Sequence, residues 1–244
     1  MFLSLFYLLV AFLPVLAYIF IIWATTPLKS INIRTAFLYL LTGLMSIGII
    51  LTYFRLFPSA QDVVAFSDMG ASLLFFCFIQ VALVEELCKL AAFAIGDKIR
   101  IDEREYDSPI GTMFYCGISA LGFAFLENVN YALTYGGEVL IARSFIAMLV
   151  HFLCGLIIGY WVAASRLPSK AKDRSFFEVV LHHRPKLKRV VYYSIGVCCA
   201  LILHGLYDFN IFSGGNQATS YMIIFGGVIS AYLAAKSLVE KSKF

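Results

Sequence analysis

The sequence predicts an all-α fold: a polytopic bundle of about seven transmembrane helices that forms a single membrane domain over residues 1–244. The chain of 244 residues is 61% hydrophobic and only 14% charged, and its mean hydropathy is +0.86. Soluble domains carry about 25% charged residues. Apolar runs of about 20 residues, long enough to span a bilayer as helices, recur along the chain. The alternating apolar and polar residues of a transmembrane β-barrel do not occur in the sequence.

Seven apolar runs define the expected helices, and polar residues define the connections between them. The expected limits are 2–23, 36–54, 70–95, 109–133, 140–163, 190–212 and 218–238. No charged residue precedes the first run, which is too long for the core of a signal peptide, so we expect a retained span. The longest connection, 164–189, is basic, and its "FFEVVL" stretch favours a segment at the membrane interface.

Basic residues alternate between rich and poor connections, and this alternation predicts the orientation. Sixteen of the 19 Lys and Arg residues lie on the first, third and fifth connections or at the C-terminal end, whereas the second and fourth connections carry two. The positive-inside rule then places the N-terminus outside, and the C-terminus and residues 164–189 in the cytosol. The net charge of +4 needs no nucleic-acid partner, because the basic connections can contact anionic membrane lipid.

All six cysteines lie within apolar runs, and the sequence has no CxxC pair and no zinc-ligand spacing of Cys and His. Buried cysteine packs as a small hydrophobic side chain. The pattern therefore predicts buried packing residues rather than a disulfide framework or a structural zinc site.

Seven titratable side chains lie inside four of the predicted helices, where charge is costly. They are Glu85, Glu86, Lys89, Glu127, His151, His204 and Asp208. Each carboxylate or ammonium costs about 2.5–3.5 kcal/mol at the centre of a transmembrane helix, so such residues usually face the interior of a bundle or a wet cavity. At a rise of about 1.5 Å per residue, their depths are similar. We therefore predict one polar layer and a catalytic core within residues 70–212.

Spacing within the third helix indicates how its charges interact. Lys89 follows Glu85 by four residues and Glu86 by three, so it can pair with either carboxylate. A purely structural ion pair would account for one glutamate and leave the other unbalanced. The two glutamates point about 100° apart around the helix axis, so only one of them can face a given centre directly.

The two helices that carry His151 and His204 offer groups that activate water. Asp208 follows His204 by four residues, and Gly155 follows His151 by four, where a glycine lets a neighbouring helix approach. A carboxylate can serve as general base, while a histidine stabilises the oxyanion or protonates the leaving amine. Alternatively, two histidines and a glutamate could hold zinc with an open position for water. No HExxH motif occurs, so a metal site would have to be assembled between helices.

Four short motifs in these helices resemble those of the PrsW-type intramembrane protease family. They are "EELCK" from Glu85, "FAFLEN" from Phe123, "HFLCG" from His151 and "HGLYD" from His204, and they fit the family patterns EExxK, FxxxEN, HxxxG and HxxxD or N. Arg143 is similar to a recurrent arginine of the family. The motifs occur in order on successive predicted helices and span about half of the chain.

The resemblance implies a multi-pass peptidase of the bacterial cell membrane that cuts membrane-anchored proteins, with anti-sigma factors as the best-known substrate class. The family is similar to the CAAX prenyl proteases and to bacteriocin-immunity proteins. By resemblance, Glu85 or Glu86 is the base. His151 and His204 are expected to be catalytic or to bind a divalent metal such as zinc, with Glu127 as a further ligand. The expected supporting residues are Lys89, Glu127, Asn128 and Asp208, and Asp208 is expected to orient His204.

Two other functions remain open from the residues alone. Buried Glu, His and Lys also build the proton relays of membrane transporters. The sequence has neither a repeat of one half in the other nor a pair of helices broken by Gly and Pro, and both features mark many transporters. A catalytically silent immunity or scaffold protein could also keep the polar residues.

Overall fold

A computed structural model describes residues 2–25, 31–56, 70–100, 108–167 and 183–242, and these residues form helices without a strand. The helices are α1 (Phe2–Thr25), α2 (Ile33–Leu56), α3 (Ala71–Phe75), η3 (Phe76–Leu83), α4 (Val84–Ile99), α5 (Pro109–Tyr135), α6 (Gly137–Arg166), α8 (Pro185–Phe212) and α9 (Gln217–Ser242). The segments α3, η3 and α4 run on without a break. Seven described helices are long and apolar enough to cross a membrane, which confirms the predicted class.

The helices extend beyond the apolar runs that predicted them. Ser108 Oγ accepts a hydrogen bond from the Gly111 N–H at 3.0 Å, and Pro109 follows at the first helical position, so α5 begins with a capped turn. Helix α8 begins at Pro185, five residues before the predicted start at Val190. Pro185 suits the first helical position, and the Lys and Arg residues that follow it are good helix formers that hydropathy does not detect. Hydropathy marks the part of a helix within the membrane, not its end.

The third span contains a π-helical segment that a hydropathy pattern cannot distinguish from an α-helix. Residues Phe76–Leu83 form η3, directly before the turn that carries the two glutamates. Phe78 of η3 packs on Gly205 of α8, where an added Cβ would lie 2.6 Å from Phe78 Cδ1. Gly205 therefore lets η3 lie against α8 next to His204.

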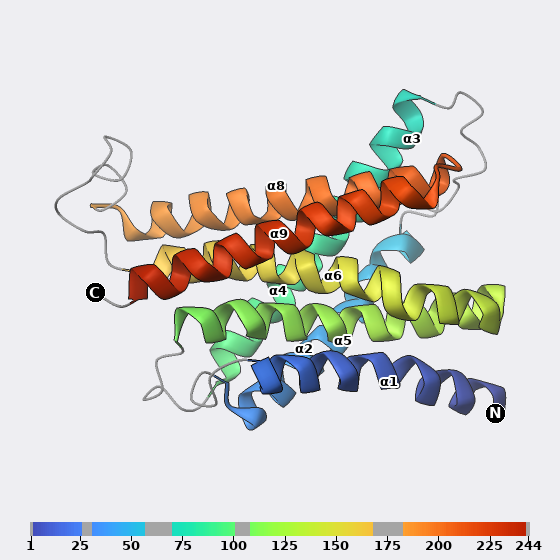
Figure 1. Cartoon of the computed structure of the whole chain (residues 1–244), viewed down its shortest axis with the longest axis horizontal. Helices are drawn as coiled ribbons and strands as arrows, with labels where there is room; N and C mark the ends of the chain where they lie inside the picture. The colour runs from blue at the N-terminus through green and yellow to red at the C-terminus, as the bar shows by residue number, and fades with distance from the viewer. Residues whose placement is uncertain (1, 26–30, 57–69, 101–107, 168–182, 243–244) are drawn as a thin grey trace.

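Helices α5 and α6 form the centre of the bundle (Figure 1). Helices α1 and α2 pack on α5, while α8 and α9 pack on α6. A Cβ on Gly155 would lie 2.8 Å from both Ala120 Cβ and the Cys116 carbonyl oxygen of α5. The predicted close approach at Gly155 is thus confirmed, and it brings His151 against α5.

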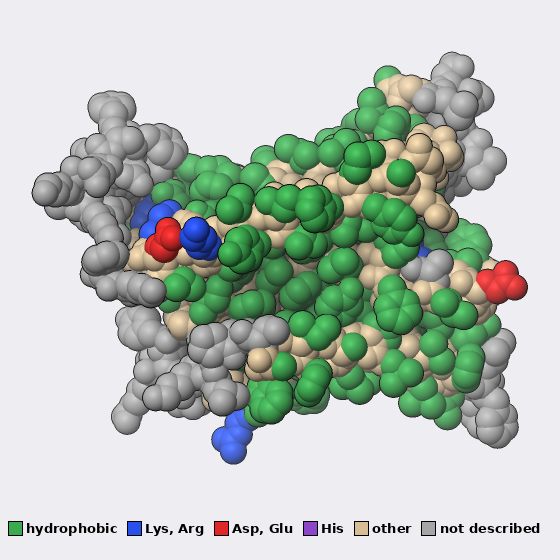
Figure 2. Space-filling view, in the orientation of Figure 1, with side chains coloured by type: hydrophobic (Ala, Val, Ile, Leu, Met, Phe, Trp, Pro, Cys, Tyr) green, Lys and Arg blue, Asp and Glu red, His purple; other side chains and the backbone are tan. Residues whose placement is uncertain are grey.

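Hydrophobic side chains cover the middle of the visible surface, and most of its charged side chains lie toward the two ends (Figure 2). This distribution is that of a protein surrounded by lipid. The two chain ends lie at opposite ends of the bundle, as an odd number of spans requires (Figure 1). The direction of the bundle across the membrane stays a prediction.

The cysteines and the connection 164–189 differ in part from the prediction. The cysteines are free, and Cys77, Cys88, Cys116 and Cys154 are buried as expected. Cys198 and Cys199 are exposed, so the prediction of burial was wrong for them, and Cys199 lines an apolar groove between α6, α8 and α9. In the connection 164–189, α6 continues to Arg166 and α8 starts at Pro185. The expected interfacial stretch "FFEVVL" and His182 lie outside the described residues.

Candidate active site

The structure brings the predicted polar side chains together where α4, α5, α6 and α8 meet. The buried members are Glu85, Glu86, Lys89, Asn128, His151 and His204, and Glu86 is 0% exposed. Glu127 and Asp208 are more open, with side-chain exposures of 13% and 16%. Close packing of the four helices thus converts residues scattered over the sequence into one cluster.

Lys89 lies at the centre of this cluster. Its Nζ is 2.8 Å from Glu86 Oε1, 2.7 Å from His151 Nδ1 and 3.5 Å from Glu85 Oε2. The ammonium also lies 4.5 Å from the centre of the Phe123 ring. One cation therefore neutralises a pair of carboxylates that would otherwise repel each other in an environment poor in water.

The two glutamates differ in their contacts. Glu86 Oε1 accepts a hydrogen bond from Lys89 and lies 2.7 Å from His204 Nδ1. An ionised carboxylate only accepts, so His204 Nδ1 carries a hydrogen, and His204 Nε2 lies 3.3 Å from another carboxylate oxygen, Asp208 Oδ2. Glu85 Oε2 is 3.8 Å from that Nε2 and accepts no hydrogen bond from the described part of the chain. Glu86 Oε2 also lacks a partner there, but Glu86 is anchored through its other oxygen.

His151 has both ring nitrogens in contact with protein atoms. Because an ammonium can only donate, Nδ1 accepts from Lys89 and the hydrogen of the neutral ring resides on Nε2. His151 Nε2 lies 2.7 Å from Glu127 Oε2. The His151 ring meets the His204 ring edge to face, with centres 5.0 Å apart.

Arg143 belongs to the cluster and lies near the beginning of α6. In the count of basic residues it was one of the two assigned to the second and fourth connections. Its Nη2 donates to Glu127 Oε1 at 2.8 Å, and its Nε donates to Asn128 Oδ1 at 3.2 Å. Its guanidinium carbon lies 3.7 Å from the centre of the Tyr131 ring. An arginine near a helix end is inexpensive in a membrane, so its position alone did not indicate a role, and only the resemblance to a recurrent arginine of the family pointed to it.

Three side chains place potential metal-binding atoms within 4.8 Å of one another: Glu85, His151 and His204. This group contains Glu85 where the resemblance suggested Glu127. One carboxylate and two imidazoles match the donors of catalytic zinc sites. Glu85 Oε2, which accepts no hydrogen bond from the described residues, fits that use, whereas His204 Nε2 would have to turn away from Asp208 Oδ2, 3.3 Å away. His151 would have to release either Lys89 or Glu127 to take part.

Asp208 and Glu86 contact opposite nitrogens of the His204 ring. Asp208 Oδ2 is 3.3 Å from His204 Nε2, and Glu86 Oε1 is 2.7 Å from Nδ1. The ring thus lies between two carboxylates, and the orienting role of Asp208 stays a prediction.

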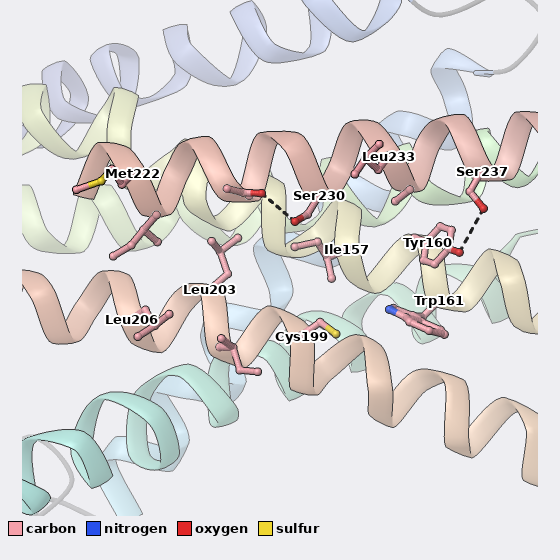
Figure 3. Close-up of a pocket in the computed structure, with 15 residues that line it drawn as sticks. Ile157, Tyr160, Trp161, Cys199, Leu203, Leu206, Met222, Ser230, Leu233 and Ser237 are labelled. Carbon is pink, nitrogen blue, oxygen red and sulfur yellow. Dashed lines mark hydrogen bonds between the residues drawn. The ribbon is translucent and has the colours of Figure 1, made fainter. Parts of the chain in front are cut away.

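A separate apolar groove of about 610 Å³ lies between α6, α8 and α9 (Figure 3). Leu203, Met222 and Trp161 line it, with small residues of α9, and the lining contains no Asp, Glu, Lys, Arg or His. Leu203 immediately precedes His204, but the groove itself contains no carboxylate or imidazole, and its titratable side chains are Tyr160 and Cys199.

Seven apolar helices around buried carboxylates, imidazoles and a lysine define a polytopic membrane protein with an ionisable site in its interior. Residues 32–233 match the sequence model of the PrsW family of intramembrane metalloproteases, and the chain belongs to this family.

Curated relatives agree with this assignment. The chain is 28% identical to Protease PrsW of Geobacillus kaustophilus over 80% of this chain and 76% of that protein. It is 26% identical to Protease PrsW of Bacillus subtilis over 67% of this chain and 65% of that protein. For Protease PrsW of Oceanobacillus iheyensis, 26% identity covers 54% of this chain and 52% of the relative, so the chain spans about half of that protein's length. No solved structure matches the chain significantly.

Proposed function

We propose that this protein is an intramembrane endopeptidase that hydrolyses peptide bonds of membrane-anchored proteins, with its catalytic core in residues 70–212. Membership of the PrsW family supports the reaction class. The observation that carries the proposal is the pair formed by Glu85 Oε2 and His204 Nε2. These atoms lie 3.8 Å apart, and Glu85 Oε2 is buried without a hydrogen bond. One water molecule can reach both atoms at about 2.8 Å.

Glu85 is the general base in this proposal. Its carboxylate takes a proton from the water held with His204 Nε2, and the water oxygen attacks the carbonyl carbon of the peptide bond. The proton passes from Glu85 to the leaving nitrogen as the C–N bond breaks, giving a carboxyl and an amine product. Lys89 Nζ, 3.5 Å from Glu85 Oε2, is the cation that favours the ionised form of this base.

The other predicted site residues act through the two histidines. Glu86 holds His204 by Nδ1, so that Nε2 faces the water, and Asp208 flanks that nitrogen. Glu127 contacts His151, which lies beside His204, and Asn128 accepts a hydrogen bond from Arg143, which also binds Glu127. In the alternative with a divalent ion such as zinc, Glu85, His151 and His204 would hold the ion, which would supply Lewis-acid activation of water and of the substrate carbonyl, and Glu85 would be a ligand rather than the base.

The substrate class follows from the location of the site. Glu85 and His204 lie within helices that are long and apolar enough to cross a membrane, so the peptide must come from a membrane-anchored protein. By resemblance, the proposed substrates are similar to anti-sigma factors. The proposed location is the bacterial cell membrane, with lipid as the surrounding partner and no role for nucleic acid.

The test is a comparison of new protein N-termini in bacterial membranes that contain the wild type, Glu85→Gln or His204→Ala. Glu138→Gln is the matched control, because Glu138 is an exposed carboxylate in the first turn of α6. We expect new N-termini within or next to transmembrane segments for the wild type and the control alone. Identical N-termini from both site variants would reject these residues as catalytic. Substrate-driven flux in proteoliposomes without cleavage would identify a transporter instead.

A further inference from the structure

We infer that the apolar groove between α6, α8 and α9 binds an anionic phospholipid of the surrounding bilayer. One acyl chain lies in the groove, and the phosphate lies at the end formed by Tyr160 and Ser237. All three helices are long and apolar enough to cross a membrane, so lipid surrounds the opening of the groove. The groove lining contains none of the buried carboxylates and histidines, and the inference does not depend on the proposed function.

The groove has the size and the polarity that an acyl chain requires. Its volume of about 610 Å³ lies within the range of about 300–1,000 Å³ that is typical of small-ligand sites. It follows α9 from Met222 to Ser237, which corresponds to about 22 Å along the helix. One leaflet contributes about 15 Å of hydrocarbon, so the groove can hold a chain over the whole depth of a leaflet. Met222 and Leu233 are exposed, so the groove is open to lipid along its side.

Small residues of α9 make the groove hollow. Gly226, Ser230 and Ala234 line it at four-residue spacing, and a Cβ on Gly226 would meet no atom within 4 Å. On the next residue, Gly227, a Cβ would lie 3.0 Å from Leu203 Cδ2, so α9 packs closely on α8 behind the groove. A volume of about 610 Å³ over about 22 Å gives a mean cross-section of about 28 Å². An α-helix about 10 Å across has a cross-section of about 80 Å² and is too wide to enter.

One end of the groove carries the side chains that suit a lipid headgroup. Tyr160 of α6 and Ser237 of α9 face each other there, with their hydroxyl oxygens 3.5 Å apart (Figure 3). The Trp161 ring lies 5.3 Å from that of Tyr160 and 5.6 Å from that of Tyr192, measured between ring centres. Trp and Tyr side chains collect at the level of the headgroups. The headgroup therefore lies at this end, and the acyl chain extends from it toward Met222.

Two lysines supply positive charge at the same end. Lys241 Nζ of α9 lies 5.9 Å from the centre of the Tyr160 ring, and Lys188 Nζ of α8 lies 5.6 Å from the centre of the Tyr192 ring. Each basic residue near a membrane surface attracts anionic lipid. Glu240 is also exposed here, but it precedes Lys241 and points about 100° away from it around the helix axis. The charge at this end therefore favours an anionic headgroup over a zwitterionic one.

Quenching of Trp161 fluorescence tests the site, because Trp161 lines the groove and the sequence contains only one other tryptophan, Trp23. The Trp23→Phe protein is placed in phosphatidylcholine nanodiscs that contain an increasing fraction of phosphatidylglycerol brominated on the part of its acyl chains next to the headgroup. Bromine quenches a tryptophan that it contacts. The reference lipid is phosphatidylcholine with the same brominated chains.

In the Trp23→Phe protein, we expect half-maximal quenching at a fraction of phosphatidylglycerol at least about fivefold lower than that of the reference lipid, which is the effect of one basic residue. Lys241→Gln should reduce this preference about fivefold, and Gly226→Phe should abolish it by filling the groove. The matched controls are Lys98→Gln and Gly48→Phe, which are expected to leave the preference unchanged. Lys98 is exposed on α4, and a Cβ on Gly48 of α2 also meets nothing within 4 Å.

Equal quenching by the two lipids, or quenching that Gly226→Phe leaves unchanged, would overturn the inference. Lys241→Gln changes an exposed side chain and keeps the test decisive if Gly226→Phe does not fold. Two other occupants give distinct results, and each would overturn the inference. A dimer that Gly226→Phe dissociates would assign the groove to a second copy of the chain. Loss of new N-termini in Gly226→Phe, with unchanged quenching, would assign it to a substrate helix.

Discussion

Lys89 Nζ lies 2.7 Å from His151 Nδ1, closer than to either glutamate of its own helix. A lysine of α4 thereby determines which nitrogen of a histidine on α6 carries the hydrogen. Because Lys89 also binds Glu86, which binds His204, one ammonium links both histidines of the site. The hydrogen-bonding states of the two imidazoles are consequently set together.

Replacing Lys89 with methionine is expected to destabilise the protein and abolish cleavage. Removing one partner from a buried charge cluster leaves the others uncompensated, which typically costs about 3–5 kcal/mol. Unfolding in detergent, followed by circular dichroism, measures the loss. Lys98→Met is the control, because Lys98 is exposed in the last turn of the same helix. Equal stability of the two variants would contradict a central role for Lys89.

The two glutamates are expected to respond differently to conversion to glutamine. Glu85→Gln should stop cleavage with little effect on unfolding, since Glu85 Oε2 accepts no hydrogen bond from the described residues. Glu86→Gln should reduce both activity and stability, because Glu86 Oε1 binds Lys89 and His204. Hydrogen bonds to charged groups contribute about 1.5–3 kcal/mol each. If Glu86→Gln is as stable as the wild type and fully active, the assignment of the two roles is incorrect.

Replacement of Gly155 with alanine tests the contact that brings α6 to α5. The new Cβ would meet Ala120 Cβ and the Cys116 carbonyl oxygen at 2.8 Å, so the helices must separate. Overpacking of this kind costs about 1–3 kcal/mol and should also reduce cleavage by moving His151 away from Glu127. In Gly226→Ala, the added Cβ meets nothing within 4 Å, and this variant should resemble the wild type. Equal behaviour of both variants would show that the α5–α6 contact is not limiting.

Metal analysis of the purified protein tests the proposed ligand group. We expect about one divalent ion per chain in the wild type and loss of the ion in Glu85→Ala and His204→Ala, whose side chains belong to the converging group. The control is His183→Ala, which changes an exposed histidine before α8. No bound ion, together with an undiminished rate after treatment with a chelator, would reject the metal and leave a glutamate-based reaction.

Reporter fusions test the predicted orientation. The positive-inside rule places the connection between α8 and α9 outside and the C-terminal end in the cytosol. Alkaline phosphatase fused after Asn216 is therefore expected to be active, and green fluorescent protein at the C-terminal end is expected to fluoresce. The opposite result at both positions would reverse the orientation.

The sequence was sufficient to predict the spans and the members of the buried cluster. Each span is a long apolar run, and residues such as Glu127 or His204 stand out in such runs because burial of a charge in a membrane is costly. The same argument could not separate Glu85 from Glu86, because the choice depends on the rotation of α4 within the bundle. Tertiary packing against α6 and α8 fixes that rotation, and no local pattern encodes it.

The role of Arg143 is harder to predict from its position in the sequence than the roles of the buried carboxylates and histidines. Basic residues near helix ends are common because they can reach the headgroup region at little cost, so an arginine at this position has no distinctive signature. The resemblance to a recurrent arginine of the family pointed to Arg143, but only the contacts with Glu127 and Asn128, fifteen or more residues away, place it in the site. The π-helical segment escaped prediction for a related reason: its residues are as apolar as those of an α-helix.

The π-helical segment Phe76–Leu83 also has an evolutionary consequence. A π-turn holds one more residue than an α-turn, so deletion of one residue there could be absorbed by conversion to α-helix while the glutamates of α4 stay in place. The same deletion in the middle of α5 would rotate one half of that helix by about 100° relative to the other and turn Glu127 away from His151. Relatives of this protein are therefore expected to differ in length within the third span more readily than within the fourth.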